Sequence, residues 1–233
     1  MKTLGILGGM SWESSAVYYR LLNQAVGARR GGLHSAPLLL ASVDFETVAE
    51  RQRVGDWAGA AAQLGRAGAG LRAAGAEALL IATNTMHKVA DEVAAKAGLP
   101  LLHIADATGA ALRAAGVRRA AFLGTRFSME DRSIVIDRLE RHGTPVLVPG
   151  PDDRALMHRV IFDELCRGVI SEASRAEVVA LIARQAARGA DSVVLGCTEI
   201  GLLIDAGCSP LPCFDTTALH AAAAVNWMLE DRA

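Results

Sequence analysis

Two short polar segments carry the side chains that are best suited to chemistry. Thr83–Thr85 (Thr-Asn-Thr) and Cys197–Glu199 (Cys-Thr-Glu) each follow an apolar run, and each closes one of two segments that align without a gap, 114 positions apart. A cysteine thiolate is a nucleophile and a base, whereas hydroxyl and amide groups bind and orient carboxylates. The alignment predicts that Thr83 and Cys197 flank a single ligand from opposite sides.

Further marks recur in the same order in the two halves of the chain. Each mark in the first half has a partner 108 to 116 positions later: Leu7-Gly8 with Leu123-Gly124, Pro37 with Pro145, and Pro100 and Asp106 with Pro210 and Asp215. Self-similarity of this kind predicts two similar α/β halves. Because all α/β segments need apolar strands and Gly-rich turns, a chance resemblance is the alternative.

Four apolar runs in the first half predict β-strands, and longer Ala-rich stretches between them predict helices. The runs are Leu4–Leu7, Leu38–Val43, Ala78–Ala82 and Leu101–Ala105, and the clearest helical stretches are Asp56–Ala74 and Lys88–Ala97. Strands that alternate with helices form parallel sheets with both faces covered. Ligands of open parallel sheets bind beyond the carboxyl ends of the strands, where backbone amides gather. The two polar segments are therefore predicted to lie where a ligand binds.

Other candidate binding groups lie in the turns after the first strand of each half. These turns are Gly8–Ser11 and Gly124-Thr125. Two consecutive glycines allow a close approach of the backbone, although the turn lacks the GxGxxG fingerprint of a dinucleotide site. Ser11, Thr85 and Thr198 are expected to cap helices whose amides hold a carboxylate.

The four cysteines have different expected roles. Cys197 lies between Gly196 and a predicted helix start, where neighbouring amides are expected to favour its thiolate. His87 follows the first polar segment closely and is either a structural histidine or a partner of that segment. No CxxC pair and no His–Cys metal spacing occurs, which predicts a site without a metal ion. The remaining cysteines are assigned to packing: Cys166, Cys208 and Cys213.

Composition excludes several classes of partner. The chain has 233 residues, 24 Lys+Arg against 25 Asp+Glu, and a net charge of -1, so we expect neither nucleic acid nor an acidic membrane surface as a partner. Only three lysines are present, which argues against Schiff-base chemistry with pyridoxal phosphate. The longest run without a charged residue, 216–229, is too short and too polar to span a bilayer. We therefore expect a cytoplasmic protein.

Three ordered motifs resemble the cofactor-independent aspartate/glutamate racemase family. They are Leu4–Ser14, Thr83–His87 and Leu195–Glu199, and the resemblance runs over essentially the whole chain. It implies an α/β fold of two pseudo-symmetric Rossmann-like subdomains, each a mostly parallel four-stranded sheet, with the site in the cleft between them. The implied boundaries are 1–105 plus 216–233 for the N-terminal subdomain and 106–215 for the C-terminal one. It also implies an amino-acid substrate, no cofactor and a homodimer.

The first-half position of the family's catalytic pair departs from the usual pattern. Two cysteines normally serve the two faces of the substrate α-carbon, but here Thr83 stands opposite Cys197. A hydroxyl is a far weaker acid than a thiol, so Thr83 is no direct equivalent of a cysteine base. The resemblance implies that Cys197 removes the α-proton of an L-amino acid. Thr83 then reprotonates the opposite face, directly or through a relay.

A dicarboxylic substrate also needs a partner for its distal group. Gln52 is the first candidate, with Arg51 and Arg53 nearby, and the lysine that some aspartate racemases use here has no counterpart in 161–167. The expected binding residues are therefore Met10, Ser11, Gln52, Asn84, Thr85, Thr125 and Thr198. Two other functions stay open. One is a single-cysteine decarboxylase of malonates, and the other is a catalytically weak amino-acid-binding protein.

Overall fold

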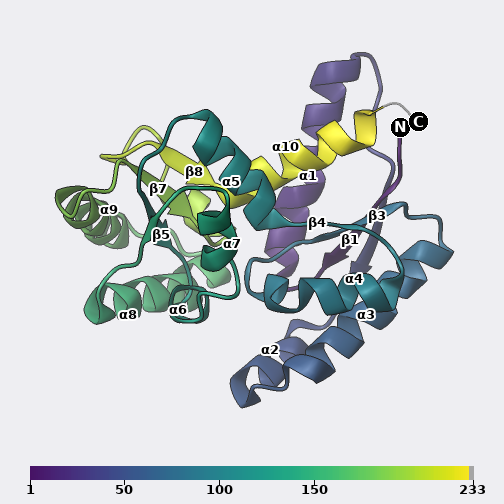
Figure 1. The fold of residues 1–233 in the computed structure, drawn as a ribbon, viewed down its shortest axis with the longest axis horizontal. Coiled ribbons are helices and arrows are strands. Elements are labelled where there is room, and N and C mark those ends of the chain that lie inside the picture. The colour runs from purple at the N-terminus through teal and green to yellow at the C-terminus, as the bar shows by residue number, and fades with distance from the viewer. Residues whose placement is uncertain (231–233) are drawn as a thin grey trace. The chain divides into compact units, whose positions relative to one another are not determined.

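The computed structural model describes residues 1–230 and divides the chain into two units (Figure 1). The first unit comprises Met1–His103 together with the stretch that begins at His220, and the second comprises Ile104–Leu219. Each unit contains its own sheet and its own hydrophobic core. The sequence placed the boundaries at 105/106 and 215/216; its assignment of 231–233 lies outside the described residues.

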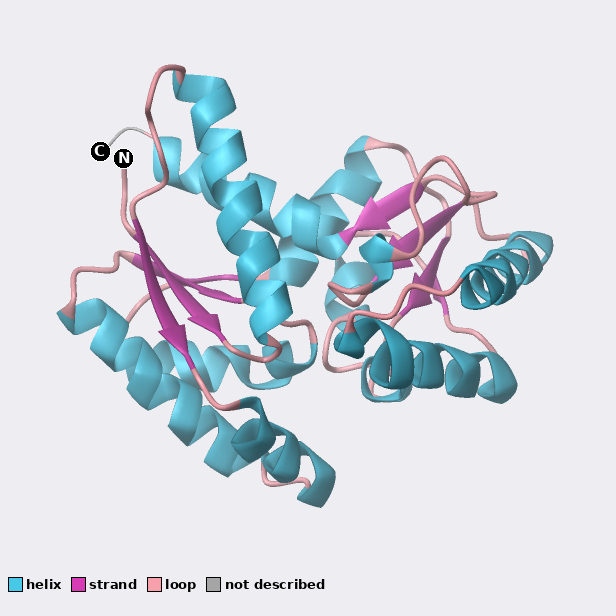
Figure 2. Ribbon diagram, turned by 180° about the vertical axis from the view of Figure 1, so that it is seen from behind, coloured by secondary structure: helices cyan, strands magenta, loops and turns pink. Residues whose placement is uncertain are grey.

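The sheet of the first unit consists of four parallel strands in the order β2-β1-β3-β4 (Figure 2). Buried aliphatic side chains on β1 and β3 make these two the central strands. The strands are β1 (Leu4–Gly8), β2 (Leu38–Ser42), β3 (Ala78–Ile81) and β4 (Leu101–Leu102). The last strand is shorter than the predicted run because helix α5 begins at Ile104.

Helices cover both faces of this sheet, as expected for buried parallel strands. On one face, α1 (Trp12–Arg30) and α10 (Thr216–Leu229) share a hydrophobic cluster with β1 and β3 (Figure 1). On the other face lie α3 (Trp57–Ala73) and α4 (Ala90–Ala97), and α2 (Phe45–Val54) adds Val48 to this cluster.

Small residues let α3 and α4 pack closely. A Cβ placed on Gly68 would lie 2.8 Å from the Cβ of Ala97, and one on Gly65 would lie 2.6 Å from the Cβ of Lys96. The chain has few aromatic side chains, so close backbone approach replaces bulky side chains in filling the interior.

The second unit repeats the same sheet, in the order β6-β5-β7-β8 with all strands parallel. Its strands are β5 (Ala120–Leu123), β6 (Val146–Leu147), β7 (Ser192–Leu195) and β8 (Cys213–Asp215). Its helices are α5 (Ile104–Ala114), α6 (Arg126–Glu130), α7 (Ile136–Arg141), α8 (Pro151–Arg159) and α9 (Glu172–Ala187). A π-helical turn, Val160–Glu164, follows α8.

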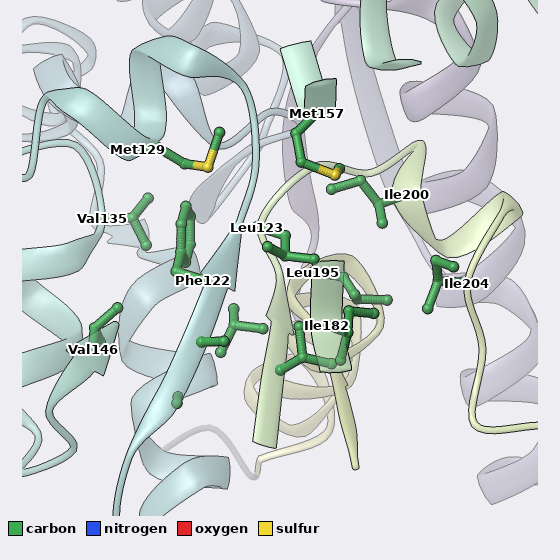
Figure 3. Close-up of a cluster of buried hydrophobic side chains, with 14 of the residues drawn as sticks. Phe122, Leu123, Met129, Val135, Val146, Met157, Ile182, Leu195, Ile200 and Ile204 are labelled. Carbon is green, nitrogen blue, oxygen red and sulfur yellow. The ribbon is translucent and has the colours of Figure 1, made fainter. Parts of the chain in front are cut away.

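The core of the second unit uses both faces of its central strands. Figure 3 shows Phe122 next to Met129 and Val135, whereas Leu195 lies near Ile182. Phe122 and Leu123 are adjacent on β5, so their side chains point to opposite faces of the sheet. Of the six residues named here, Met129 is 2% exposed and the other five are 0 or 1% exposed.

The predicted duplication is visible in individual backbone hydrogen bonds. Ala82 N–H donates to Leu7 O at 2.9 Å, and Gly196 N–H donates to Leu123 O at 2.6 Å. Leu4 N–H donates to Pro37 O at 3.1 Å, and Ala120 N–H donates to Pro145 O at 3.0 Å. Equivalent atoms thus make equivalent bonds in the two units, which extends the similarity from motifs to geometry.

Two of the predicted matches between the halves are wrong. Leu79 N–H donates to Pro100 O and Val193 N–H donates to Pro212 O, so the counterpart of Pro100 is Pro212 and not Pro210. The strand register also places Asp215 opposite Leu195, which makes His103, and not Asp106, the counterpart of Asp215. Asp106 instead lies in α5.

In each half of the chain, the helix that follows the last strand of the sheet belongs wholly or mostly to the other unit. Strand β4 belongs to the first unit, but α5 that follows it belongs to the second. Strand β8 belongs to the second unit, and α10 that follows it joins the first unit from His220 onward. Within 1–230, no helix is long and apolar enough to cross a membrane.

Candidate active site

The turn after β3 presents Thr83 at the carboxyl end of the first sheet. Thr83 is half-buried, whereas Ala82, Asn84 and Thr85 on either side are buried. Ser14, in the first turn of α1, donates its hydroxyl to Ala82 O at 2.8 Å. This bond brings the start of α1 against the Thr83 turn, so the Thr83 side chain is the part of the turn that remains accessible.

A cluster of three histidines supports this turn from behind. His87 Nδ1 lies 2.8 Å from Thr83 O, and because a carbonyl can only accept, Nδ1 carries the proton. The ring centroid of His87 lies 4.6 Å from that of His103 and 5.6 Å from that of His220. Burial, followed by the positive charges that His103 and His220 would carry, lowers the pKa of His87 well below its usual value. His87 is therefore a neutral structural donor at pH 7.

His220 in turn is fixed by two hydrogen bonds. Its Nε2 lies 2.8 Å from Leu102 O and must donate there, so Nδ1 accepts from the Tyr18 hydroxyl at 2.9 Å. Tyr18 and His220 are both fully buried. The cluster thus ties α1, β4 and α10 to the Thr83 turn within the first unit. Sequence reasoning missed it because its members lie far apart in the chain.

The turn after β7 presents Cys197 at the equivalent place in the second sheet. Cys197 is half-buried between buried neighbours, as Thr83 is. Its thiol donates to Glu199 Oε2 at 2.9 Å, and the Thr198 hydroxyl donates to the same oxygen at 2.6 Å. Glu199 is only 6% exposed. The motif that contains Glu199 was noted in the sequence, but Glu199 itself was not predicted as a functional residue.

The expected thiolate is a second error of the sequence analysis. Burial and the neighbouring Glu199 raise the pKa of Cys197 well above its usual value. The predicted helix start is only a single 3-10 turn, Ile200–Leu202, which offers little dipole to oppose the carboxylate. At pH 7, Cys197 is therefore a neutral thiol.

Two of the three predicted helix caps are also wrong. Ser11 does cap α1, because its hydroxyl accepts from Ser14 N–H at 3.3 Å. Thr85 is instead the first residue of a 3-10 turn, Thr85–Val89, and Thr198 donates its hydroxyl to a carboxylate. Neither side chain caps a helix, so backbone amides of these turns remain the candidate carboxylate donors.

The turns after the first strands hold the remaining predicted contacts. Met10 is 4% exposed and packs in the apolar cluster beneath the sheet, so only its backbone can reach a ligand. Gly9 has a φ of 90°, and a Cβ there would lie 2.2 Å from Val43 O, so this position needs glycine. In the second unit, Thr125 caps α6 through Ser128 N–H, and a Cβ on Gly124 would lie 3.2 Å from Gly196 O. Thr125 therefore follows the end of β5, the strand that pairs with β7 beside the Cys197 turn.

The three candidates for the distal group differ in their surroundings. Gln52 Nε2 lies 3.0 Å from the sulfur of Met86, which places Gln52 beside the 3-10 turn that follows Thr83. Arg51 forms an ion pair with Asp56, and Arg53 pairs with Glu46 at 2.5 Å. Both arginines already have carboxylate partners, and Gln52 stays the first candidate for the distal group.

The three other cysteines pack against the core of the second unit. They are Cys166, Cys208 and Cys213, and all four cysteines are free. Burial, with a contribution from Glu199, raises the pKa of Cys166 to about 12, so it is an inert thiol. Among residues 1–230, no group of three His, Cys, Asp or Glu side chains is arranged to hold a metal ion.

Comparison with known proteins decides the family. A model of the Asp/Glu/Hydantoin racemase family matches residues 7–224. This chain belongs to that family. A provisionally assigned Asp/Glu racemase from Yersinia pestis is 48% identical, with a TM-score of 0.92 over 99% of this chain and 100% of its own. An aspartate racemase homologue from Pyrococcus horikoshii is 30% identical, with a TM-score of 0.85 over 99% of this chain and 100% of its own.

A more distant member of the racemase fold is the aspartate racemase from Picrophilus torridus. It is 18% identical, with a TM-score of 0.74 over 98% of this chain and 94% of its own, and this likeness concerns the fold alone. The predicted family and the predicted two-sheet α/β fold are thereby confirmed. The sheets are parallel throughout rather than mostly parallel.

Proposed function

We propose that this racemase-family chain inverts aspartate, glutamate or a related amino acid without a cofactor, using Cys197 and Thr83 on opposite faces of the α-carbon. One observation carries the proposal. Thr83 and Cys197 are each the half-buried residue of an otherwise buried turn, at equivalent strand ends of the two repeated sheets. Cys197 removes the α-proton of the L-enantiomer, and Thr83 delivers a proton to the other face.

The negative charge that develops on the substrate needs stabilisation in this scheme. Backbone amides of the Thr83–Thr85 and Cys197–Glu199 turns, with the hydroxyls of Thr85 and Thr198, supply dipoles for the α-carboxylate. Asn84, Ser11 and Thr125 add polar groups at the same strand ends, and Gln52 binds the distal group. Preorganised dipoles of this kind replace the electron sink that a cofactor supplies elsewhere.

Proton exchange is the direct test. The protein is incubated in D₂O with a panel of L- and D-amino acids, and loss of the α-proton signal is followed by NMR. We expect exchange of an acidic L-amino acid that is faster than its inversion, because Cys197 returns a solvent-derived proton to the face it came from more readily than Thr83 protonates the other. Absence of exchange with every amino acid overturns the proposal. Light scattering after size-exclusion chromatography tests the homodimer that we also propose.

A decarboxylase of disubstituted malonates is the second candidate, because a single cysteine suffices to protonate one face. The solved arylmalonate decarboxylases are distant, sharing the fold at 16% identity. The same NMR experiment with an arylmalonate in place of the amino acids separates the two reactions, since only decarboxylation releases CO₂.

A further inference from the structure

The Cys197 thiol has a dedicated proton acceptor in the second unit. A thiol cannot remove an α-proton until its own proton has left, and the Sγ proton is already directed at Glu199 Oε2, 2.9 Å away. The same carboxylate oxygen accepts the Thr198 hydroxyl at 2.6 Å, which holds the acceptor in place. Glu199 is buried and sits two residues from Cys197 in the same turn, so the pair needs no conformational change to exchange a proton.

We propose that Glu199 is a catalytic residue that takes the Cys197 thiol proton as substrate binds and returns it when the thiolate is no longer needed. The inference rests on the proposed function, since it names the base that forms the thiolate. Glu199 is a catalytic residue in this scheme because its carboxylate contacts the sulfur that takes the α-proton.

The proton balance of the step is closed. The Sγ–H bond breaks and an Oε2–H bond forms, which leaves a thiolate and a neutral carboxylic acid. The thiolate then takes the α-proton, so that an S–H bond forms while the C–H electron pair stays on the substrate as a carbanion. In exchange without inversion, the thiol gives a solvent-derived proton back to the carbanion, and Glu199 returns its proton to the thiolate.

Inversion needs one further transfer. Thr83 protonates the opposite face and thereby loses its own proton. Solvent then gives a proton to Thr83 and takes the extra proton from Glu199. Glu199 is therefore required for both exchange and inversion, whereas Thr83 is required for inversion only. A negative carboxylate beside the sulfur also agrees with the raised pKa of Cys197, because it disfavours the thiolate until the thiol proton has moved to Glu199.

The test variant is Glu199→Gln, which keeps size and polarity but cannot accept a proton. Two readouts are measured on the full chain: the pH dependence of Cys197 alkylation by iodoacetamide, followed by mass spectrometry, and α-proton exchange of L-aspartate and L-glutamate in D₂O. We expect the alkylation midpoint to fall by about one pH unit or more, because a negative neighbour is lost. We expect exchange to fall by about 100-fold, because the thiol proton has no acceptor.

A matched control and a second variant keep the test sharp. Glu140→Gln makes the same change at a half-buried carboxylate that accepts from Val146 N–H and Arg132, outside the proposed site, and should leave both readouts as in wild type. Thr198→Val removes one donor to Oε2 but keeps the carboxylate, so the alkylation midpoint should rise. This opposite shift remains measurable where Glu199→Gln fails to fold.

A midpoint that stays in place in the folded variants overturns the proposal, and so does wild-type exchange in Glu199→Gln despite a lowered midpoint. The alkylation readout needs no substrate. A wild-type protein that exchanged no amino acid would thus overturn the proposed function, while the midpoint would still report on the Cys197–Glu199 pair.

Discussion

The two polar turns occupy the same place in two copies of one sheet, yet opposite chemistry supports them. Behind Thr83 stand three imidazoles, and His87 donates a proton to the turn's own carbonyl. Behind Cys197 stands a carboxylate that accepts a proton from the turn's own side chain. One turn is held by a donor and the other by an acceptor. Duplication preserved the backbone while the supporting side chains diverged in charge.

Equivalent positions make the divergence explicit. The offset of 114 pairs His87 with Gly201, and the strand register pairs His103 with Asp215. A Cβ on Gly201 would lie 2.9 Å from Asp215 Oδ2, so the space that an imidazole fills in one unit is closed by a carboxylate in the other. The comparison teaches that carboxylates lie around the Cys197 turn in one unit, whereas imidazoles lie around the Thr83 turn in the other.

Removing the Cys197 thiol should have the largest effect, because it should abolish both reactions. Cys197→Ala should lower both α-proton exchange and inversion by a factor on the order of 10³ or more, because the Cys197 sulfur is the group proposed to take the α-proton. The measurement is NMR exchange in D₂O, with circular dichroism as the folding control. If Cys197→Ala exchanges L-substrates at nearly the wild-type rate, Cys197 has no part in the mechanism.

Changing the Thr83 hydroxyl should affect inversion but not exchange of the L-enantiomer. Thr83→Ala should lose inversion by about 100-fold and keep exchange of the L-enantiomer, since only protonation of the second face is lost. Thr83→Cys should make the two turns alike and turn D-amino acids into good exchange substrates. Polarimetry measures inversion and NMR measures exchange. Wild-type inversion by Thr83→Ala would reduce Thr83 to a packing residue.

The distal-group candidates give a smaller effect. Gln52→Ala should raise the KM for an acidic amino acid by about 10-fold, the loss expected for one hydrogen bond to a charged group. Arg53→Gln is the control, because an exposed ion pair such as the one with Glu46 adds little to stability, and we expect little change in KM. A larger KM effect from Arg53→Gln than from Gln52→Ala would reverse the assignment.

Acid should lower the stability of the folded protein through His87, which supports the Thr83 turn. The pKa of His87 is lowered in the folded protein, so between its folded and unfolded pKa values the unfolded chain binds more protons. Its contribution to stability is therefore full above about pH 6.5 and is lost as the pH falls toward the folded value. Urea titrations at pH 7.5 and 5.5 measure this loss.

His87→Asn sharpens the same test. It should cost about 1–3 kcal/mol at pH 7.5, through the lost hydrogen bond to Thr83 O and the lost packing, and should weaken the acid dependence. The matched control is His34→Asn, because His34 is exposed on the loop before β2. Equal acid dependence in wild type and His87→Asn would remove His87 from the pH response.

Local pattern predicted the strands and the repeat, because both rest on neighbouring residues. Leu4–Leu7 and Ala78–Ala82 each lie within one residue of an observed strand. Features that depend on distant contacts were missed or misread. The Tyr18–His220 bond joins residues that are 202 positions apart, and nothing in either sequence neighbourhood announces it.

The alignment predicted that Thr83 and Cys197 follow equivalent strands, but it did not predict the protonation state of Cys197. Thr83 and Cys197 lie in equivalent turns, as the alignment implied, but the sequence read Glu199 as part of a helix start. Whether an acidic residue at such a position caps amides or accepts a thiol proton depends on the direction of its side chain. Here the Glu199 carboxylate accepts the Cys197 thiol and the Thr198 hydroxyl and does not cap the 3-10 turn that follows.

The exchange of final helices between the units has a consequence for synthesis on the ribosome. All four strands of the first sheet lie within the first 102 residues, but one of its faces is covered in part by Ala221, Ala224, Val225 and Met228 of α10. Until these last turns emerge, the apolar face of a finished sheet stays exposed to water, and Tyr18 lacks the acceptor that His220 provides. The first unit to be translated is thus the last to be completed, and a nascent chain stalled before residue 216 presents the surface that chaperones bind.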